Sequence, residues 1–104
     1  MSNTIKDVNG KDFAAFIKEG KVVVDFWAAW CGPCRTQGQI LEDGEKSFED
    51  AGVKVAKVNV EQENALAAQY GVSSIPALLI FEDGELKETL VGVQTVDSLI
   101  ARFN

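Results

Sequence analysis

The sequence of 104 residues contains no histidine, only two cysteines, two prolines and one methionine. Without a histidine or a third cysteine, one copy of the chain cannot supply the four cysteine and histidine ligands of a structural zinc site. The apolar stretch at residues 22–31 contains Asp25 and is about half as long as a membrane-spanning helix requires. We therefore expect neither a metal centre nor a membrane span.

Positive charge is also in short supply, with 10 Lys and Arg residues against 16 Asp and Glu residues and a net charge of −6. A negative surface repels phosphates, so we expect neither nucleic acid nor an anionic membrane as a partner. Residues 1–7 lack the apolar segment and cleavage site of a signal peptide, which predicts a cytoplasmic protein. A permanent disulfide is not expected in that reducing compartment, so the two cysteines need another role.

The length and the 46% content of hydrophobic residues suit one compact domain over residues 1–104. Apolar spacing predicts alternating strands and helices, followed by two antiparallel strands around a tight turn at Asp83-Gly84. The expected strands are 4–8, 21–28, 53–60, 77–81 and 86–91, and the expected helices are 9–17, 35–50, 63–70 and 95–103. The fold class is therefore α/β, with a central strand covered by helices on both faces.

The two cysteines lie in the run Trp30-Cys31-Gly32-Pro33-Cys34, directly after an apolar strand. At a strand-to-helix junction, unpaired N–H groups and the helix dipole stabilise an anion, which lowers the pKa of the Cys31 thiol and makes it the nucleophile. Cys34 lies one helical turn further on the same face, within disulfide distance, and can resolve a mixed disulfide. Pro33 is tolerated in a first helical turn, and Gly32 leaves the backbone open to a partner.

Asp25 interrupts a strand that is apolar on both alternating faces. A carboxylate buried there is costly to ionise, so we expect its pKa to rise above the solution value, which makes Asp25 a proton carrier near neutral pH. The alternative is an aspartate at a strand edge, hydrogen-bonded to backbone. Spacing alone does not place Asp25 near Cys34, because that depends on how the helix folds back.

Together, the motifs DFWA at 25–28, WCGPC at 30–34 and IP at 75–76, with Gly84 and Gly92 downstream, resemble the thioredoxin family over essentially the whole chain. The resemblance implies the thioredoxin fold, with a mixed sheet of about five strands flanked by four helices. It also implies a monomer that reduces protein disulfides through a cysteine dithiol cycle, needs no cofactor, and is recycled by a separate thioredoxin reductase.

The resemblance also assigns roles to single residues. It implies that Cys31 attacks the substrate disulfide and that Cys34 resolves the intermediate after losing its proton towards Asp25. Lys57 is implied to lie near that carboxylate and to tune it. The alternative is a strand lysine whose amine extends to solvent. The expected partners are thus oxidised substrate proteins and the reductase.

A substrate-binding surface is implied around the cysteines. The resemblance predicts a cis peptide bond at 75–76 that offers backbone hydrogen bonds to an extended substrate segment. Around it we expect an apolar rim, although each of its residues alone is also typical of core or turn. The rim residues are Trp30, Gly32, Pro33, Val60, Ile75, Pro76, Gly92 and Val93.

Several positions depart from the family pattern. Gln39 stands where relatives commonly have a proline, so we expect a weaker or differently caused bend in helix 35–50. Gly44 replaces an aliphatic residue that faces the core, which removes burial worth roughly 1.5–3 kcal/mol unless neighbours fill the gap. Arg35 and the serines at 73–74 replace a usual lysine and glycine, and these changes concern partner choice more than chemistry.

Other functions remain compatible with these residues. A disulfide oxidase or isomerase uses the same chemistry, but such relatives typically carry a histidine between the cysteines, and Gly32-Pro33 favours the reductant. A dimer would be able to ligate an iron–sulfur cluster or a metal through one cysteine pair from each subunit. A non-catalytic binding subunit would use the cysteine-bearing surface only for docking.

Overall fold

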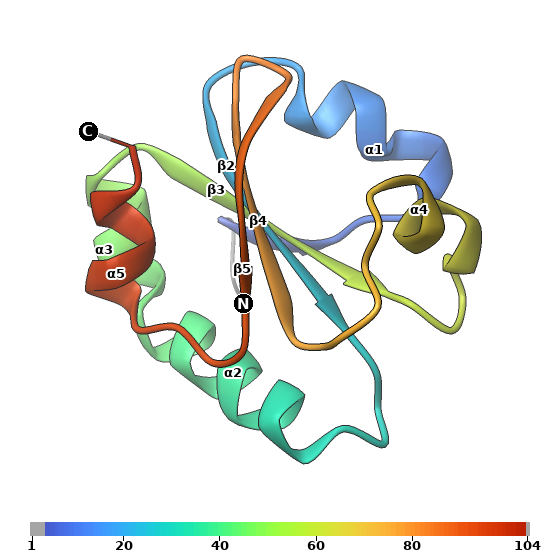
Figure 1. Cartoon of the computed structure of the whole chain (residues 1–104). Helices are drawn as coiled ribbons and strands as arrows, with labels where there is room; N and C mark the ends of the chain where they lie inside the picture. The colour runs from blue at the N-terminus through green and yellow to red at the C-terminus, as the bar shows by residue number, and fades with distance from the viewer. Residues whose placement is uncertain (1–3, 104) are drawn as a thin grey trace.

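The structure is a computed structural model that describes residues 4–103. Residues 1–3 and residue 104 lie outside the described residues. Residues 1–3 belong to the segment that is expected to lack a signal peptide. Within the described chain, the strands form one mixed sheet in the order β1-β3-β2-β4-β5 (Figure 1). The strands are β1 (Ile5–Asp7), β2 (Lys21–Trp27), β3 (Val53–Asn59), β4 (Ala77–Glu82) and β5 (Glu85–Val91).

The helices form a layer on each face of this sheet (Figure 1). Helices α1 and α4 cover one face, and α2, α3 and α5 cover the other. Their bounds are α1 (Gly10–Ile17), α2 (Gly32–Asp43), α3 (Glu45–Asp50), α4 (Asn64–Gln69) and α5 (Val96–Ala101). Within residues 4–103, none of them has the length and apolar composition needed to cross a bilayer.

Strand β2 occupies the centre of the sheet. It pairs in parallel with β3 and antiparallel with β4, and its residues from Val22 to Phe26 are all buried. Val22 and Val24 pack towards α1 and α4, whereas Val23 packs towards α2, α3 and α5. The prediction of a strand buried on both faces is therefore confirmed. Because side chains alternate along a strand, Asp25 shares the face of Val23.

The expected helix 35–50 is in fact two helices, divided at Gly44, so five helices flank the sheet within residues 4–103 where four were expected. Gly44 is the C-cap of α2, because its backbone leaves the helical conformation (φ −93°, ψ 6°), and its N–H is shared between the carbonyls of Ile40 and Leu41 at 3.0 and 3.2 Å. A Cβ at residue 44 would overlap Cγ2 of Val96 on α5. Val96 therefore fills the space that an aliphatic side chain at residue 44 would occupy.

The helix is not interrupted at Gln39. Helix α2 continues through this residue to Asp43, and the Gln39 side chain donates a hydrogen bond to Asp43 at 2.8 Å, one turn later. The interruption falls at Gly44 instead, where α2 ends and α3 begins. The expected helix is therefore divided at a glycine packed against Val96 of α5 and not at Gln39.

We expect Gly44→Ala to destabilise the protein by about 1–3 kcal/mol, because the added methyl group overlaps Val96. The better helix propensity of alanine, about 1 kcal/mol, opposes this loss without cancelling it. The measurement is urea unfolding of Gly44→Ala, of Val96→Ala and of the double variant that combines them. With Val96→Ala in place, Gly44→Ala should become neutral or stabilising, and an equal loss in both backgrounds would contradict the packing argument.

Candidate active site

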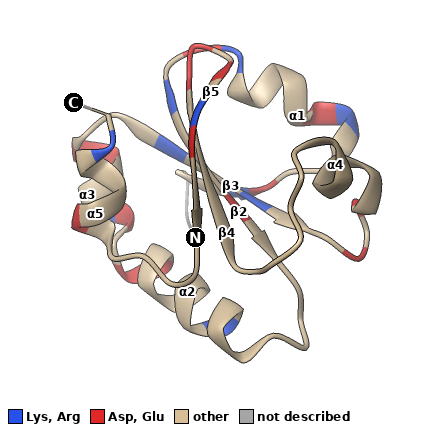
Figure 2. Ribbon diagram, viewed as in Figure 1, with Lys and Arg blue, Asp and Glu red and all other residues tan. Residues whose placement is uncertain are grey.

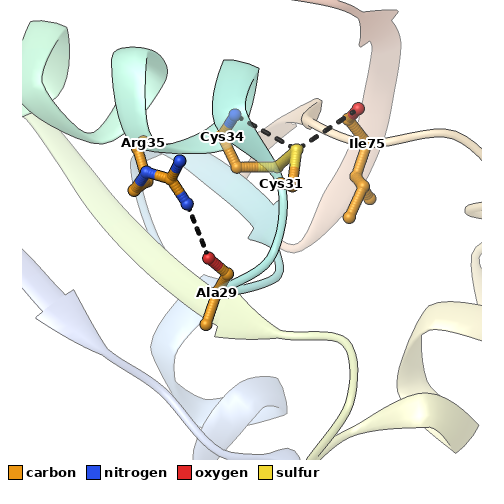
Figure 3. Close-up of a disulfide and its surroundings, with 5 residues drawn as sticks. All are labelled: Ala29, Cys31, Cys34, Arg35 and Ile75. Carbon is orange, nitrogen blue, oxygen red and sulfur yellow. Dashed lines mark hydrogen bonds between the residues drawn. A yellow bond between two sulfur atoms is a disulfide. The ribbon is translucent and has the colours of Figure 1, made fainter.

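Cys31 and Cys34 lie where β2 leads into α2, the strand-to-helix junction that the sequence predicts. They form a disulfide with Cα atoms 5.2 Å apart, and only 5% and 3% of their surfaces are exposed. Cys31 is the N-cap of α2, and its Sγ accepts a hydrogen bond from the Cys34 N–H at 3.2 Å (Figure 3). A thiolate at Cys31 would therefore be stabilised by this N–H and by the positive end of the helix dipole.

Two distant segments meet beside the disulfide. The Ile75–Pro76 peptide bond is cis, as the resemblance implies, and the Ile75 carbonyl oxygen lies 3.9 Å from Sγ of Cys31 (Figure 3). The N–H of Gly92 donates to the Pro76 carbonyl at 2.9 Å, which ties the β5–α5 loop to the same place. Gly92 has a φ of 94°, a conformation that favours glycine.

The residues of the expected rim occupy two kinds of position. Four of them are buried or partly buried, and these are Val60, Ile75, Pro76 and Gly92. Val60 and Ile75 pack directly against the two cysteines. The remaining members are exposed, with Trp30 69% and Val93 42% open to solvent. The exposed members are Trp30, Gly32, Pro33 and Val93.

Asp25 is completely buried in β2. Among residues 4–103, neither of its carboxyl oxygens has a hydrogen-bond partner, so the alternative of an aspartate bonded to backbone does not apply. Burial raises the pKa of Asp25 to about 7, and the positive charge of Lys57 partly opposes this rise. The carboxyl group is therefore able to take up or release a proton near neutral pH.

Lys57 is the neighbour of Asp25 in the register of β2 and β3. Its Nζ lies 5.1 Å from the centroid of the Trp27 ring, and a Cβ at residue 38 would come within 3.2 Å of the same nitrogen. Gly38 thus leaves room for the amine against α2. Lys57 also borders a cavity of about 370 Å³.

Sequence reasoning missed Gln37, although its side chain on α2 is completely buried. Its Nε2 donates to the Gln94 carbonyl at 3.0 Å, and its Oε1 accepts from the Gln94 N–H at 2.6 Å. Cys34, Gln37 and Leu41 are spaced by three and four residues, so the sequence itself places Gln37 on the same helical face as two apolar residues.

Arg35 lies on the exposed side of the same helix. Its Nη1 donates to the Ala29 carbonyl at 2.9 Å, which ties the guanidinium to the connection between β2 and α2 (Figure 3). Sequence reasoning noted Arg35 only as a departure from the family pattern and did not predict this bond.

Two sulfurs that can bond to each other at a helix N-terminus are able to accept and return two electrons by exchange with another disulfide. With a titratable carboxyl buried in the adjacent strand, this arrangement defines the class of thiol–disulfide oxidoreductases. The family model for thioredoxin matches residues 4–104. The chain belongs to the thioredoxin family.

Individual relatives agree with this assignment. The chain is 44% identical over 100 residues to a thioredoxin of Chlamydia caviae, covering 96% of each sequence. It is 42% identical over 89 residues to the thioredoxin of Bacillus subtilis, covering 86% of this chain and 85% of that one. The structure matches a mutant thioredoxin from Halobacterium salinarum with a TM-score of 0.83 at 35% identity, covering 97% and 89% of the two chains. The expected thioredoxin fold and dithiol–disulfide oxidoreductase activity are confirmed.

The raised pKa of Asp25 makes stability depend on pH. Between the ordinary value of 3.8 and the folded value of about 7, the folded protein retains a proton that the unfolded chain has lost. Stability therefore falls as pH rises through this window, by up to about 4 kcal/mol at pH 7 and above. We expect Asp25→Asn to be more stable than the unaltered protein at pH 8 and similar to it near pH 4.

Urea unfolding of both oxidised proteins across this pH range measures the effect. The remaining carboxyl groups are common to both proteins and cancel in the difference. A difference in unfolding free energy that stays constant from pH 4 to pH 8 would show that Asp25 ionises normally in the folded protein.

Proposed function

We propose that this chain is a cytoplasmic, monomeric, single-domain carrier that takes electrons from a thioredoxin reductase and delivers them to oxidised substrate proteins. The observation that carries the proposal is the disulfide between the helix-capping Cys31 and the buried Cys34. Its setting supports reduction, because Gly32 and Pro33 place no charged group between the sulfurs.

The proposed cycle begins with both cysteines reduced. The Cys31 thiolate attacks one sulfur of a substrate disulfide, a mixed disulfide forms, and the other substrate sulfur leaves as a thiolate. Cys34 then loses its proton towards the Asp25 carboxylate and attacks Sγ of Cys31. The mixed disulfide breaks, the second substrate thiolate leaves, and the Cys31–Cys34 disulfide stores the oxidation. The reductase returns two electrons and restores both thiols.

The surface around the disulfide supports a peptide as the substrate. The segments that meet there, residues 26–34, 72–81 and 89–96, contain no charged residue. In Figure 2 the connection from β2 to α2 is correspondingly free of charge colours, whereas acidic segments gather on the helices and at the β4–β5 turn. An extended substrate would bond to the backbone near Ile75 and rest its side chains on Trp30 and Val93.

Cys31→Ser should lower the rate of insulin disulfide reduction by more than about a hundredfold, because the attacking sulfur is lost. Cys34→Ser should instead accumulate a stable mixed disulfide with the substrate, because the attacking sulfur remains and the resolving sulfur is gone. Turbidity assays with dithiothreitol as electron donor, together with mass spectrometry of trapped complexes, provide the measurements. Retained turnover in Cys31→Ser would contradict the assigned nucleophile.

The direction of the reaction has its own measurement. Equilibration with glutathione buffers gives the reduction potential of the Cys31/Cys34 pair. A potential more reducing than that of the glutathione pool supports a reductant, and a more oxidising potential would indicate an oxidase or isomerase.

Lys57 should control the pH at which the mixed disulfide resolves. Its charge lowers the pKa of Asp25, so Lys57→Met should raise that pKa further and leave fewer carboxylates to accept the Cys34 proton at pH 7. We expect resolution to slow by about tenfold at pH 7 in Asp25→Asn, and its pH midpoint to move upward in Lys57→Met.

Rapid-quench measurement of the mixed-disulfide lifetime against pH tests this expectation. Lys54→Met is the matched control, because Lys54 lies on the same strand but donates to the Phe16 carbonyl on the other side of the sheet. An unchanged lifetime in Asp25→Asn would remove the carboxyl from the cycle.

A further inference from the structure

We infer that Gln37 is a positioning residue that holds the loop at residues 92–95 against the redox helix and so favours protein substrates over small disulfides. This inference rests on the proposed function, because it concerns the surface that a substrate protein would contact. It assigns Gln37 no contact with substrate.

The two hydrogen bonds of Gln37 are unusual in their geometry and burial. The side chain is completely buried on α2, and its donor and its acceptor both bond to the backbone of one residue, Gln94. A buried amide is tolerated only when it is hydrogen-bonded, and here both halves are satisfied. An apolar side chain of the same length would fill the space but would leave the Gln94 N–H and carbonyl without these partners. Two bonds to one residue also fix both the distance and the orientation of the loop.

The loop is held at a second place as well. The N–H of Gly92 donates to the Pro76 carbonyl at 2.9 Å, and the Gln94 side chain donates to the Gly92 carbonyl at 3.3 Å. Val93, 42% exposed, lies between these two attachments. Gln37 therefore completes a connection from the helix that carries Cys34, through the loop, to the cis-proline segment that touches Cys31.

Loss of the Gln37 bonds would release the loop from α2 and leave it attached to Pro76 through Gly92 and to α5 through the bonds of Ser98 with Gln94 and Thr95. A substrate protein that rests on Val93 would then have to order the loop as it binds, which costs affinity. A small disulfide that reaches only the sulfur of Cys31 has no such requirement. The two substrates should therefore respond differently to a change at Gln37.

The test compares Gln37→Met with the matched control Gln39→Met, an exposed glutamine on the same helix that bonds only locally to Asp43. Second-order rate constants of the reduced proteins are measured with insulin and with hydroxyethyl disulfide. We expect Gln37→Met to lower the insulin constant roughly three- to tenfold and to change the small-disulfide constant by less than about twofold. Gln39→Met should change neither. Equal losses for both substrates, or no loss for insulin, would overturn the inference.

Amide hydrogen exchange separates this inference from the proposed function. If the unaltered protein does not reduce insulin, the proposed function fails, and the exchange of the Gln94 amide still tests the bond from Gln37. It should be faster in Gln37→Met than in the unaltered protein by about tenfold or more. If Gln37→Met does not fold, the exchange rates of two amides are compared within the unaltered protein. The Gln94 amide should exchange more slowly than the amide of the exposed Val93. Equal exchange rates in either comparison would overturn the inference.

Discussion

Pairing of β2 with β3 on one side and with β4 on the other is the constraint on which the site depends. Both edges of β2 are occupied and both of its faces are covered, so the strand delivers its end to a fixed point in the molecule. That end leads through residues 28–30 to Cys31, and β4 begins at Ala77, just after the Ile75 carbonyl that lies beside Cys31. A rigid central strand therefore fixes where Cys31 meets the Ile75 carbonyl.

The same burial creates the chemistry of Asp25. No other carboxyl group in the described chain is fully buried, and its cost of ionisation is the reason that its pKa reaches about 7. A carboxyl at the surface would be ionised at every physiological pH and would not change its charge during the cycle. The fold thus loses stability near neutral pH and gains a group that can exchange protons there. The positive charge of the neighbouring Lys57 lowers the pKa of Asp25 and so limits this cost.

Much of this arrangement could be predicted from local patterns. The alternation of apolar residues predicted β2 and its two buried faces, and the spacing of Cys31 and Cys34 predicted a disulfide at a helix start. The division at Gly44 could not be predicted, because it depends on Val96 from a distant helix. The role of Gln37 depends on a partner 57 residues away, which no local pattern contains. The break at Gly44 and the bonds of Gln37 both depend on tertiary packing between segments that are distant in the sequence.

Helix α2 shows why such a long-range bond matters to redox chemistry. Its buried face carries Leu41 as the large apolar residue near one end, while Gly38 has no side chain and Cys34 belongs to the disulfide. Apolar contact is non-directional and does not by itself fix rotation or register. The disulfide lies within the first turn and opens in every cycle, so it does not anchor the helix. The bonds from Gln37 to Gln94 join the helix to the loop at residues 92–95 and involve neither sulfur, so opening the disulfide does not itself break them.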